Sequence, residues 1–363
     1  MGLEFLKYFE GLEDPRIDRR KLHPLEELLL VSLCAVIGGC DDWVEIAEFG
    51  RERLDFFRQY LPFENGIASD DTFRRVFSLL NPKSFQECFI AWVQAMRTEL
   101  GGIIAIDGKT LRRSFSENTK PLHLLSAFSA ENRLILGQQA VAEKSNEITA
   151  IPALLKLLDI KGSTITVDAM GCQRKIAQQI VEQGGHYVMG LKGNQGTLEK
   201  DVKLFFTDNS LTKNLPTFQT VEKDHGRLET RQIKVCSSIN WLQESHEWPG
   251  LQSLLEITST REENGKKTTE KRYYISDLME SPERFLYIVR SHWSIENSLH
   301  WTLDVIFHED QCRSRKDHSP ANFAMIRHAA LNLIRTNKHP KKSIKLSRKK
   351  ASWSTNALAN ILK

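Results

Sequence analysis

Residues 101–108 read Gly-Gly-Ile-Ile-Ala-Ile-Asp-Gly, and residues 163–169 read Ser-Thr-Ile-Thr-Val-Asp-Ala. Each is a short run rich in β-branched and other apolar residues, which predicts a buried strand. Each run ends on an aspartate beside a small residue, Asp107 in the first and Asp168 in the second. Because α/β sheets bind ligands in the crevice at the carboxyl ends of their strands, we expect both carboxylates to face one crevice.

The segments around these two runs predict a single sheet with helices on its faces. Residues 122–129 and 133–141 are predicted strands joined by a tight polar turn. Amphipathic patterns predict helices over 148–158 and 173–183, and residues 186–191 form another apolar run. The resulting order is strand, strand, strand, helix, strand, helix, strand. This order is typical of an α/β domain.

The first 95 residues form a predicted N-terminal helical region. Apolar residues dominate 25–37 and recur at helical spacing over 43–60. Residues 69–72 offer N-caps to a helix that Pro82 is expected to stop. Short helices that include a Thr-Phe-Arg-Arg sequence fit a helix-turn-helix-like DNA reader. The alternative is a helical cap or a dimerisation module.

The second half of the chain is interrupted by a polar segment with β-like alternation. We interpret residues 196–282 as a β-rich insertion, because a Glu-Glu-Asn-Gly turn there predicts a hairpin and helical patterns resume afterwards. The α/β domain then comprises residues 96–195 and 283–335. Residues 336–363 form a basic C-terminal tail.

Charge and cysteine usage limit the environment of the chain. The net charge is +4 over 363 residues, but residues 335–350 contain eight Lys or Arg and no acid. Such a segment is either simply solvated or neutralises phosphates. The six cysteines lack zinc-binding spacing, which favours reduced thiols. No apolar run approaches the roughly 18–20 residues of a membrane span, and a signal peptide is not evident. We expect a cytoplasmic protein without a membrane partner.

A pair of adjacent aspartates predicts a cation, because two carboxylates held side by side repel each other. Mg²⁺ suits such a pair, since it takes oxygen ligands and binds substrate phosphates. A turn or helix-cap role is the alternative for each aspartate alone. Glu296 is the best third carboxylate, because a helix places it on one face with Trp293 and His300. Pairing of Glu296 with a nearby Arg is its alternative, and the competing acids are Asp304, Glu309 and Asp310.

Four motifs occur along the chain in a fixed order: Ile-Asp-Gly-Lys-Thr at 106–110, Val-Asp-Ala-Met at 167–170, Leu-Lys-Gly-Asn-Gln at 191–195 and His-Trp-Ser-Ile-Glu-Asn at 292–297. In these motifs the chain resembles bacterial insertion-sequence transposases that have an RNase H-like catalytic domain. It is most similar to the H-repeat-associated group, over about residues 1–340. The resemblance implies an RNase H-like core with an inserted β-rich subdomain and an N-terminal helical region.

The resemblance also implies a DDE transposase. It places the three catalytic and metal-binding acids of the family on Asp107, Asp168 and Glu296. Two Mg²⁺ ions, which Mn²⁺ can replace, would support cleavage of the transposon ends and strand transfer into target DNA. The implied partner is double-stranded DNA, both terminal repeats and target, bound by a homodimer or a larger assembly. The long gap before the glutamate matches related transposases that carry a β-rich insertion.

One departure concerns the cations around the glutamate. Related transposases carry Arg four residues before Glu and Lys seven residues after it, where this sequence has His292 and Leu303. Phosphate contacts can pass instead to other residues. Amide and ammonium groups beside a metal site can donate hydrogen bonds to the phosphate and sugar groups of DNA. The alternative is that these residues belong to solvated turns. The candidates for DNA binding are Lys109, Arg112, Lys192, Asn194, Arg290, His292, Arg313 and Arg315.

Two further functions are compatible with the same residues. A non-joining RNase H-like nuclease would use the same acids. A catalytically decayed transposase would act only as a DNA-binding protein. Trp293 and Trp301 fit either the stacking of a flipped base or a core, and the pattern favours the core.

Overall fold

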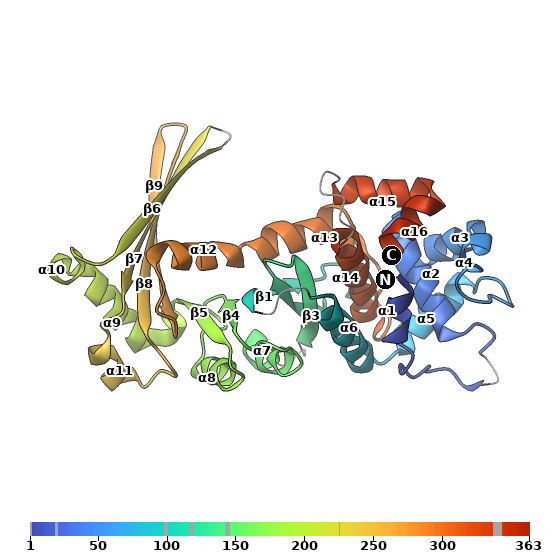
Figure 1. Cartoon of the computed structure of the whole chain (residues 1–363), viewed down its shortest axis with the longest axis horizontal. Coiled ribbons are helices and arrows are strands. Elements are labelled where there is room, and N and C mark those ends of the chain that lie inside the picture. Colours follow the sequence, from blue (N-terminus) through green and yellow to red (C-terminus); the bar gives the residue numbers. More distant parts are fainter. Residues whose placement is uncertain are drawn as a thin grey trace.

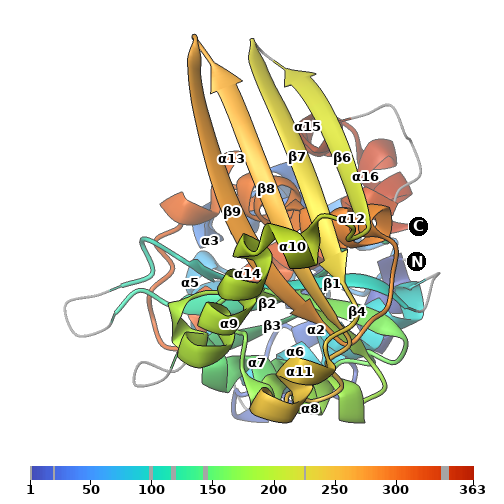
Figure 2. The same ribbon diagram turned by 90° about the vertical axis from the view of Figure 1, so that its left-hand side faces the viewer.

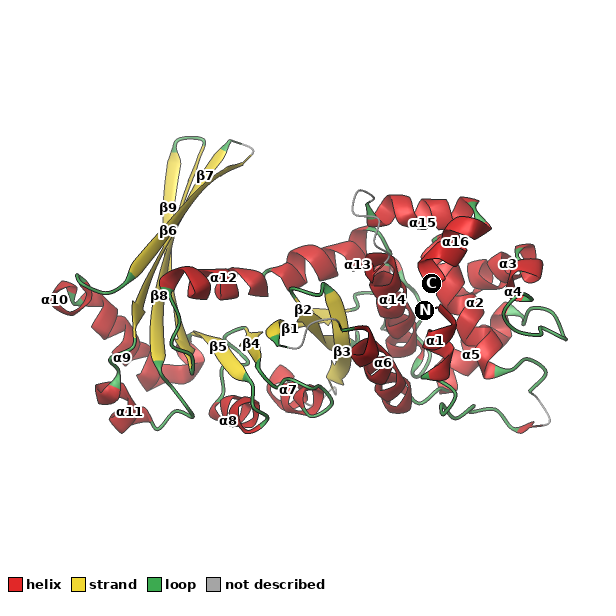
Figure 3. Cartoon of the chain, viewed as in Figure 1, coloured by secondary structure: helices red, strands yellow, loops and turns green. Residues whose placement is uncertain are grey.

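A nine-stranded sheet runs through the computed structural model in the order β3-β2-β1-β4-β5-β9-β8-β7-β6 (Figure 1). The structure describes residues 2–18, 21–97, 101–115, 120–141, 146–224, 226–336 and 343–363. Helices pack on both faces of the half of the sheet that contains β1 to β5. A helical region adjoins the edge of the sheet at β3 (Figure 3). The predicted mixed α/β fold is confirmed.

The first five strands form the core of the sheet. Their bounds are β1 (Gly102–Thr110), β2 (His123–Ser129), β3 (Leu134–Val141), β4 (Ser163–Val167) and β5 (His186–Leu191). β1, β2 and β3 pair antiparallel, whereas β4 and β5 continue parallel to β1. Every residue of β4 is buried, as expected for a parallel strand that is covered on both faces. This order is that of the RNase H-like core that the resemblance implied.

Three helices cover the core strands. α7 (Glu147–Leu155) and α8 (Arg174–Glu182) pack on one face, and α12 (Pro282–His292) lies on the other (Figure 1). Only one side of α8 is buried, through Ile176, Ala177 and Ile180. The other side carries polar residues, so the amphipathic pattern in the sequence predicted this helix correctly.

The predicted insertion extends the same sheet. Its elements are α9 (Gly196–Thr207), α10 (Asn209–Thr212), β6 (Thr217–Asp224), β7 (Arg227–Cys236), α11 (Asn240–His246), β8 (Ser253–Glu263) and β9 (Lys266–Ser276). β9 pairs antiparallel with β5, from Val188 opposite Ser276 to Leu191 opposite Tyr273. The far halves of β6–β9 project beyond the helices as a long four-stranded arm (Figure 2). The insertion therefore places β9 directly beside the core strands.

The N-terminal region is helical, as predicted. It contains α1 (Gly2–Lys7), α2 (Leu25–Gly38), α3 (Trp43–Glu52), α4 (Leu54–Phe57), α5 (Asp70–Leu79) and α6 (Pro82–Met96). The side chains of Asp42, Ser69 and Asn81 accept hydrogen bonds at the starts of α3, α5 and α6. Pro82 begins α6 instead of merely ending α5, because the first helical position needs no backbone N–H donor.

The helix α14 (Ser319–Thr336) joins the N-terminal region to the sheet. It is buried along most of its length. The amide of Asn322 donates hydrogen bonds to the carbonyl oxygens of Phe77 and Leu80, both at 2.9 Å. The amide of Asn332 bonds both backbone groups of Ile135 on β3, at 2.9 Å each. These polar contacts fix α14 against both regions, since buried amides require partners.

The C-terminal segment differs from the expected tail. It forms α15 (Ile344–Trp353) and α16 (Thr355–Leu362), which pack near α2, and the two chain ends lie close together (Figure 1). The guanidinium of Arg348 is buried and donates to the carbonyl oxygen of Val36 at 3.0 Å. The sequence left open whether this charge run is solvated or neutralises phosphates, and Arg348 shows that part of it has a structural role. None of the helices in the described ranges is long and apolar enough to cross a membrane.

Candidate active site

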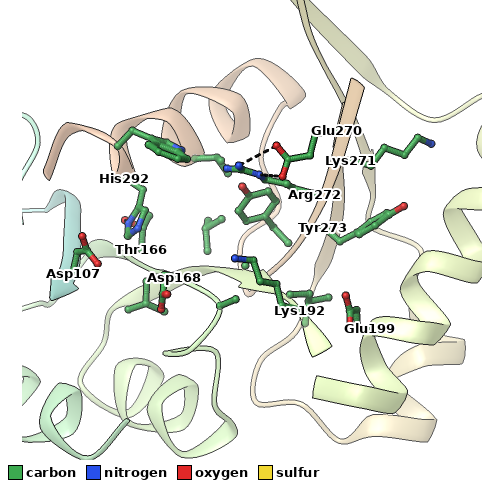
Figure 4. A pocket seen from close by; sticks show the side chains of 18 of the residues that line it. Asp107, Thr166, Asp168, Lys192, Glu199, Glu270, Lys271, Arg272, Tyr273 and His292 are labelled. Atoms are coloured by element: carbon green, nitrogen blue, oxygen red, sulfur yellow. Dashed lines mark hydrogen bonds and ion pairs between the residues drawn. The ribbon is translucent and has the colours of Figure 1, made fainter. Parts of the chain in front are cut away.

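The register of two parallel strands brings the predicted aspartates together. Ile106 of β1 opposite Val167 of β4 is the last pair between these strands. Asp107 directly follows Ile106 and Asp168 directly follows Val167, so both lie where the parallel pairing of the two strands ends. Asp168 follows its strand as predicted, whereas Asp107 lies inside β1, which continues to Thr110 through pairing with β2. Both aspartates line one cavity (Figure 4).

The carboxyl group of Asp107 is strongly perturbed. Its side chain is 20% exposed. Burial raises the pKa of Asp107 to about 7, and the carboxylates of Glu147, Glu296 and Asp168 contribute to this rise against a lowering backbone hydrogen bond at Gly108. Such repulsion shows that the three predicted acids share one electrostatic environment.

Asp168 is held by its own turn. One carboxylate oxygen, Oδ1, accepts the backbone N–H groups of Met170 at 2.9 Å and Gly171 at 3.2 Å. These bonds leave the side chain exposed at the cavity. Asp168 therefore stabilises a turn and also lines the cavity.

Glu296 lies in a π-helical turn, η3 (Ile295–His300), between α12 and α13 (Trp301–Val305). The N–H of Trp301 donates to the carbonyl oxygen of Glu296, five residues earlier. The prediction of a regular helix at this position is therefore wrong. Glu296 nevertheless lines the cavity with both aspartates. Single π-helical turns are frequent at functional sites, where they reorient side chains. This turn also brings His300 within 3.7 Å of Asp107.

The wall of the cavity opposite the aspartates carries both cationic and acidic side chains. The cavity has a volume of about 430 Å³. Its cationic side chains are Lys192, Lys203, Lys271 and Arg272. Lys203 pairs with Glu199 at 2.7 Å, and Lys271 pairs with Glu256 at 2.9 Å. Arg272 makes a two-pronged ion pair with Glu270, at 2.9 and 3.1 Å (Figure 4). The sequence predicted only Lys192, because pairing of β9 with β5 is what brings residues 271–272 to the site.

Two cations predicted near Glu296 have partners within the protein. The Nδ1 atom of His292 lies 3.0 Å from the hydroxyl of Thr166, and burial lowers the pKa of His292. His292 lines the cavity as a half-buried group. Arg290 pairs with Glu222 of β6, with Nη2 at 3.0 Å from Oε2. Arg290 therefore ties α12 to the arm.

Lys109 contacts carboxylates and not the open cavity. Its ammonium lies 2.7 Å from Glu309 and 3.7 Å from Asp310, and it also bonds Asp304. The acids that competed with Glu296 in the sequence are thus paired. Arg112 has an exposed side chain and lies 3.2 Å from Asp310.

The other predicted DNA contacts do not line the cavity with the three acids within the described residues. Arg313 is exposed. Arg315 donates from Nε to the carbonyl oxygen of Arg113 at 3.0 Å and lies over the ring of Phe115. Asn194 belongs to the short turn η2 (Gly193–Gln195), and its side chain lies outside the described part of the structure.

The two tryptophans beside Glu296 are surface residues. Trp293 is 42% exposed and Trp301 is 55% exposed, so the core interpretation was wrong. Trp293 lines the acidic cavity and also a neighbouring groove along the arm. The guanidinium of Arg272 lies 5.3 Å from its ring centroid.

The side chains of Asp107, Asp168 and Glu296 have the chemistry that a divalent cation requires, although their arrangement does not form a complete metal site in the described residues. Within the described ranges, no group of three or more His, Cys, Asp or Glu side chains is arranged to hold one metal ion. However, the pKa of Asp107 is raised first by burial and then by neighbouring carboxylates, and a bound cation would relieve that repulsion. Oxygen donors of this kind are the ligands that Mg²⁺ takes. The donor set therefore fits the metal that the resemblance implied.

Comparison with known proteins covers nearly the whole chain. Residues 6–93 match the family model described as "DDE_Tnp_1-associated", and residues 99–333 match "Transposase DDE domain". The chain is 40% identical to the "H repeat-associated putative transposase YhhI" of Escherichia coli (strain K12), over 99% of this chain and 97% of that protein. It is 42% identical to "Putative protein YbfL" of the same strain, with the same coverage of both chains. The "Inactive transposase YbfQ" of that strain is 49% identical over 21% of this chain and 94% of its own length.

Proposed function

The chain belongs to the DDE transposase family, and on this premise we propose that it catalyses DNA transposition through Asp107, Asp168 and Glu296. The proposed reaction is cleavage at the ends of a mobile element followed by strand transfer into target DNA. The observation that supports it most directly is the register of β1 and β4, which sets Asp107 beside Asp168. Glu296 completes the acidic side of the same cavity.

The three acids would hold two Mg²⁺ ions, or Mn²⁺ in their place. Bound there, the ions would supply a nucleophile at neutral pH and charge stabilisation of the leaving oxygen. Asp168 is pre-positioned by the N–H groups of Met170 and Gly171. Glu296 is positioned by the π-helical turn. Positioning and electrostatics provide most of the catalysis in phosphoryl transfer, so these local constraints are central to the proposal.

The cationic side chains that line the cavity are the proposed contact with the DNA backbone. They are Lys192, Lys203, Lys271 and Arg272, and of these Lys271 points away from the aspartates (Figure 4). Cations that contact phosphates release counterions, so binding should weaken as salt concentration rises. Arg272 is held in place by Glu270, which leaves its guanidinium oriented beside Trp293. The DNA strand to be cut would lie in the cavity between the three acids and the cationic side chains.

The N-terminal helices are proposed to recognise the terminal repeats of the element. Support comes from the exposed residues Arg74 and Arg75 on α5. Arg74 pairs with Asp70 at 2.9 Å, which reduces its availability. A dimerisation role for residues 1–95 is the alternative. Cutting two ends in one complex would call for a homodimer or a larger assembly on DNA.

The test is a cleavage assay on DNA that carries the element's own ends, with Mg²⁺ or Mn²⁺. The intact chain is compared with Asp168→Ala and with Glu244→Ala, an exposed acid on α11 that serves as the matched control. We expect metal-dependent nicking and joined products from the intact chain and from the control. Asp168→Ala should give neither while keeping its melting temperature.

The outcomes also separate the competing functions. Nicking without joined products would select a non-joining nuclease. End-specific binding without any nicking would select a decayed transposase, a possibility raised by the relative named inactive and by Leu303 in place of Lys. Cutting that survives Asp168→Ala would remove Asp168 from the site.

A further inference from the structure

Lys109 bridges the strand of the first acid and the segment that follows the third. We propose that Lys109 is a positioning residue that holds β1, and with it Asp107, in register with the turn that carries Glu296. This inference rests on the proposed function and adds a residue to the same site. It replaces the expectation that Lys109 contacts DNA.

The contacts of the Lys109 ammonium all lie in one segment. Asp304 belongs to α13, while Glu309 and Asp310 belong to the short helix η4 (Glu309–Gln311). The ammonium lies 2.7 Å from Glu309 and 3.7 Å from Asp310, and it bonds Asp304 as well. This segment begins directly after the π-helical turn, so Lys109 links it to β1.

The position of Lys109 on β1 makes the link relevant to the acids. Successive side chains of a strand alternate between faces, so Asp107 and Lys109 project from the same face of the sheet. Asp107 contacts His300, the last residue of the π-helical turn, at 3.7 Å. Lys109 contacts the elements just beyond that turn. β1 is thereby held to the Glu296 segment at two neighbouring points.

The ion pair between Lys109 and Glu309 is buried, and charged residues of α14 lie near it. The side chain of Lys109 is 11% exposed and that of Glu309 is 2% exposed. Burial raises the pKa of Glu309, but the nearby charges of Lys109 and Arg327, with His328, lower it overall. Arg327 and His328 come from α14 and are both 2% exposed. Charged groups of α14, the helix that joins the sheet to the N-terminal region, therefore act electrostatically on Glu309.

Burial also argues against a direct contact between Lys109 and DNA. An ammonium that is surrounded by three carboxylates would have to abandon them in order to reach a phosphate. Breaking a buried pair leaves an uncompensated charge, which is strongly unfavourable. Lys192, which is exposed and lines the cavity, has no such constraint on reaching DNA.

The test uses variants that separate positioning from folding. Lys109→Met leaves Glu309 buried without its partner, so the informative variant is the double substitution Lys109→Met with Glu309→Gln. Lys109→Arg keeps the charge and serves as the rescue. The matched control is Lys267→Met with Glu262→Gln, which removes a pair at 3.0 Å near the tip of the arm. Each full-length variant is titrated with Mn²⁺ by calorimetry and assayed for end cleavage.

We expect the double variant to bind Mn²⁺ about 10–100-fold more weakly, as for other residues that orient metal ligands. Its kcat should fall by a similar factor, while its KM for DNA stays unchanged. Lys109→Arg should recover most of the Mn²⁺ affinity, and the control should match the intact chain. A double variant with unchanged Mn²⁺ affinity and kcat would overturn the inference, even if its melting temperature fell. A rise in KM alone would return Lys109 to DNA contact.

Failure of the proposed function gives a different result. If Asp168→Ala binds Mn²⁺ as tightly as the intact chain, the acids do not form the metal site. The positioning role of Lys109 would then fall together with that site. If Asp168→Ala loses Mn²⁺ and the double variant does not, only the inference about Lys109 is wrong.

Discussion

The Nδ1 atom of His300 lies 3.7 Å from the Oδ2 atom of Asp107. Burial, followed by the charge of Lys109, lowers the pKa of His300 to about 4, so the imidazole is neutral near pH 7. The contact is therefore between a neutral ring and an acid and is not a salt bridge. It connects β1 directly to the π-helical turn that carries Glu296.

Removal of the His300 ring should impair catalysis more than folding. We expect His300→Ala to lower kcat roughly tenfold or more, because Asp107 loses a neighbour that limits its movement relative to Glu296. The measurement is end cleavage at saturating DNA. His318→Ala, at an exposed histidine, is the control. Equal kcat values for the two variants would show that the contact has no role in positioning.

Asp107 should make the metal-free protein less stable as pH rises. The pKa of this carboxyl is raised from 3.8 to about 7 by burial and neighbouring carboxylates. Between these values the unfolded chain releases its proton while the folded protein retains it, so the free energy of unfolding decreases as pH increases.

The measurement is urea unfolding of metal-free protein at about pH 5 and about pH 7.5, spanning most of this transition. Asp107→Asn should reduce the loss of stability between the two values, and Glu244→Gln should not. Mn²⁺ should bind more tightly at the higher pH, because it competes with the proton. An identical pH dependence in Asp107→Asn and the intact chain would contradict the assignment.

Trp293 should matter for DNA and not for the fold. It is 42% exposed between the acidic cavity and the groove along the arm. Trp293→Ala should leave the melting temperature nearly unchanged but weaken DNA binding by about 1–3 kcal/mol if a base stacks on the ring. Trp353→Ala, at a residue that is 71% exposed on α15, is the control. Equal affinities for DNA in both variants would exclude stacking on Trp293.

Arg348 should stabilise the packing of α15 on the N-terminal helices. Its guanidinium donates to the carbonyl oxygen of Val36 and lies 4.1 Å from the ring centroid of Phe307. Arg348→Met should lower the free energy of unfolding by on the order of 2–3 kcal/mol, since buried carbonyls lose a charged donor. Lys349→Met, at the exposed next residue, should change it little. Both values are measured by denaturant unfolding.

The sequence predicted the core strands because their apolar runs are local features. The runs ending at Asp107 and Asp168 form neighbouring strands, and the hairpin expected over 122–141 forms as β2 and β3. Amphipathic spacing also predicted α8. These elements depend on which residues are buried, and burial leaves a periodic pattern in the sequence.

The sequence failed where a contact joins segments that are distant along the chain. Lys109 was expected to contact DNA because its three acidic partners lie about 200 residues away along the chain. Lys271 and Arg272 were missed because only the pairing of β9 with β5 brings them to the cavity. Charge by itself does not reveal whether a side chain meets solvent, DNA or an internal acid.

The sequence by itself determined the α/β core, the helical N-terminal region and the identity of the three candidate acids, because hydrophobic periodicity and short motifs are written in neighbouring residues. Only the tertiary structure decided which cations line the cavity with those acids, that Glu296 lies in a π-helical turn, and that the basic C-terminal segment is helical. The physical reason is that ion pairing, burial and strand register depend on distances between remote segments. Local sequence patterns carry no record of those distances.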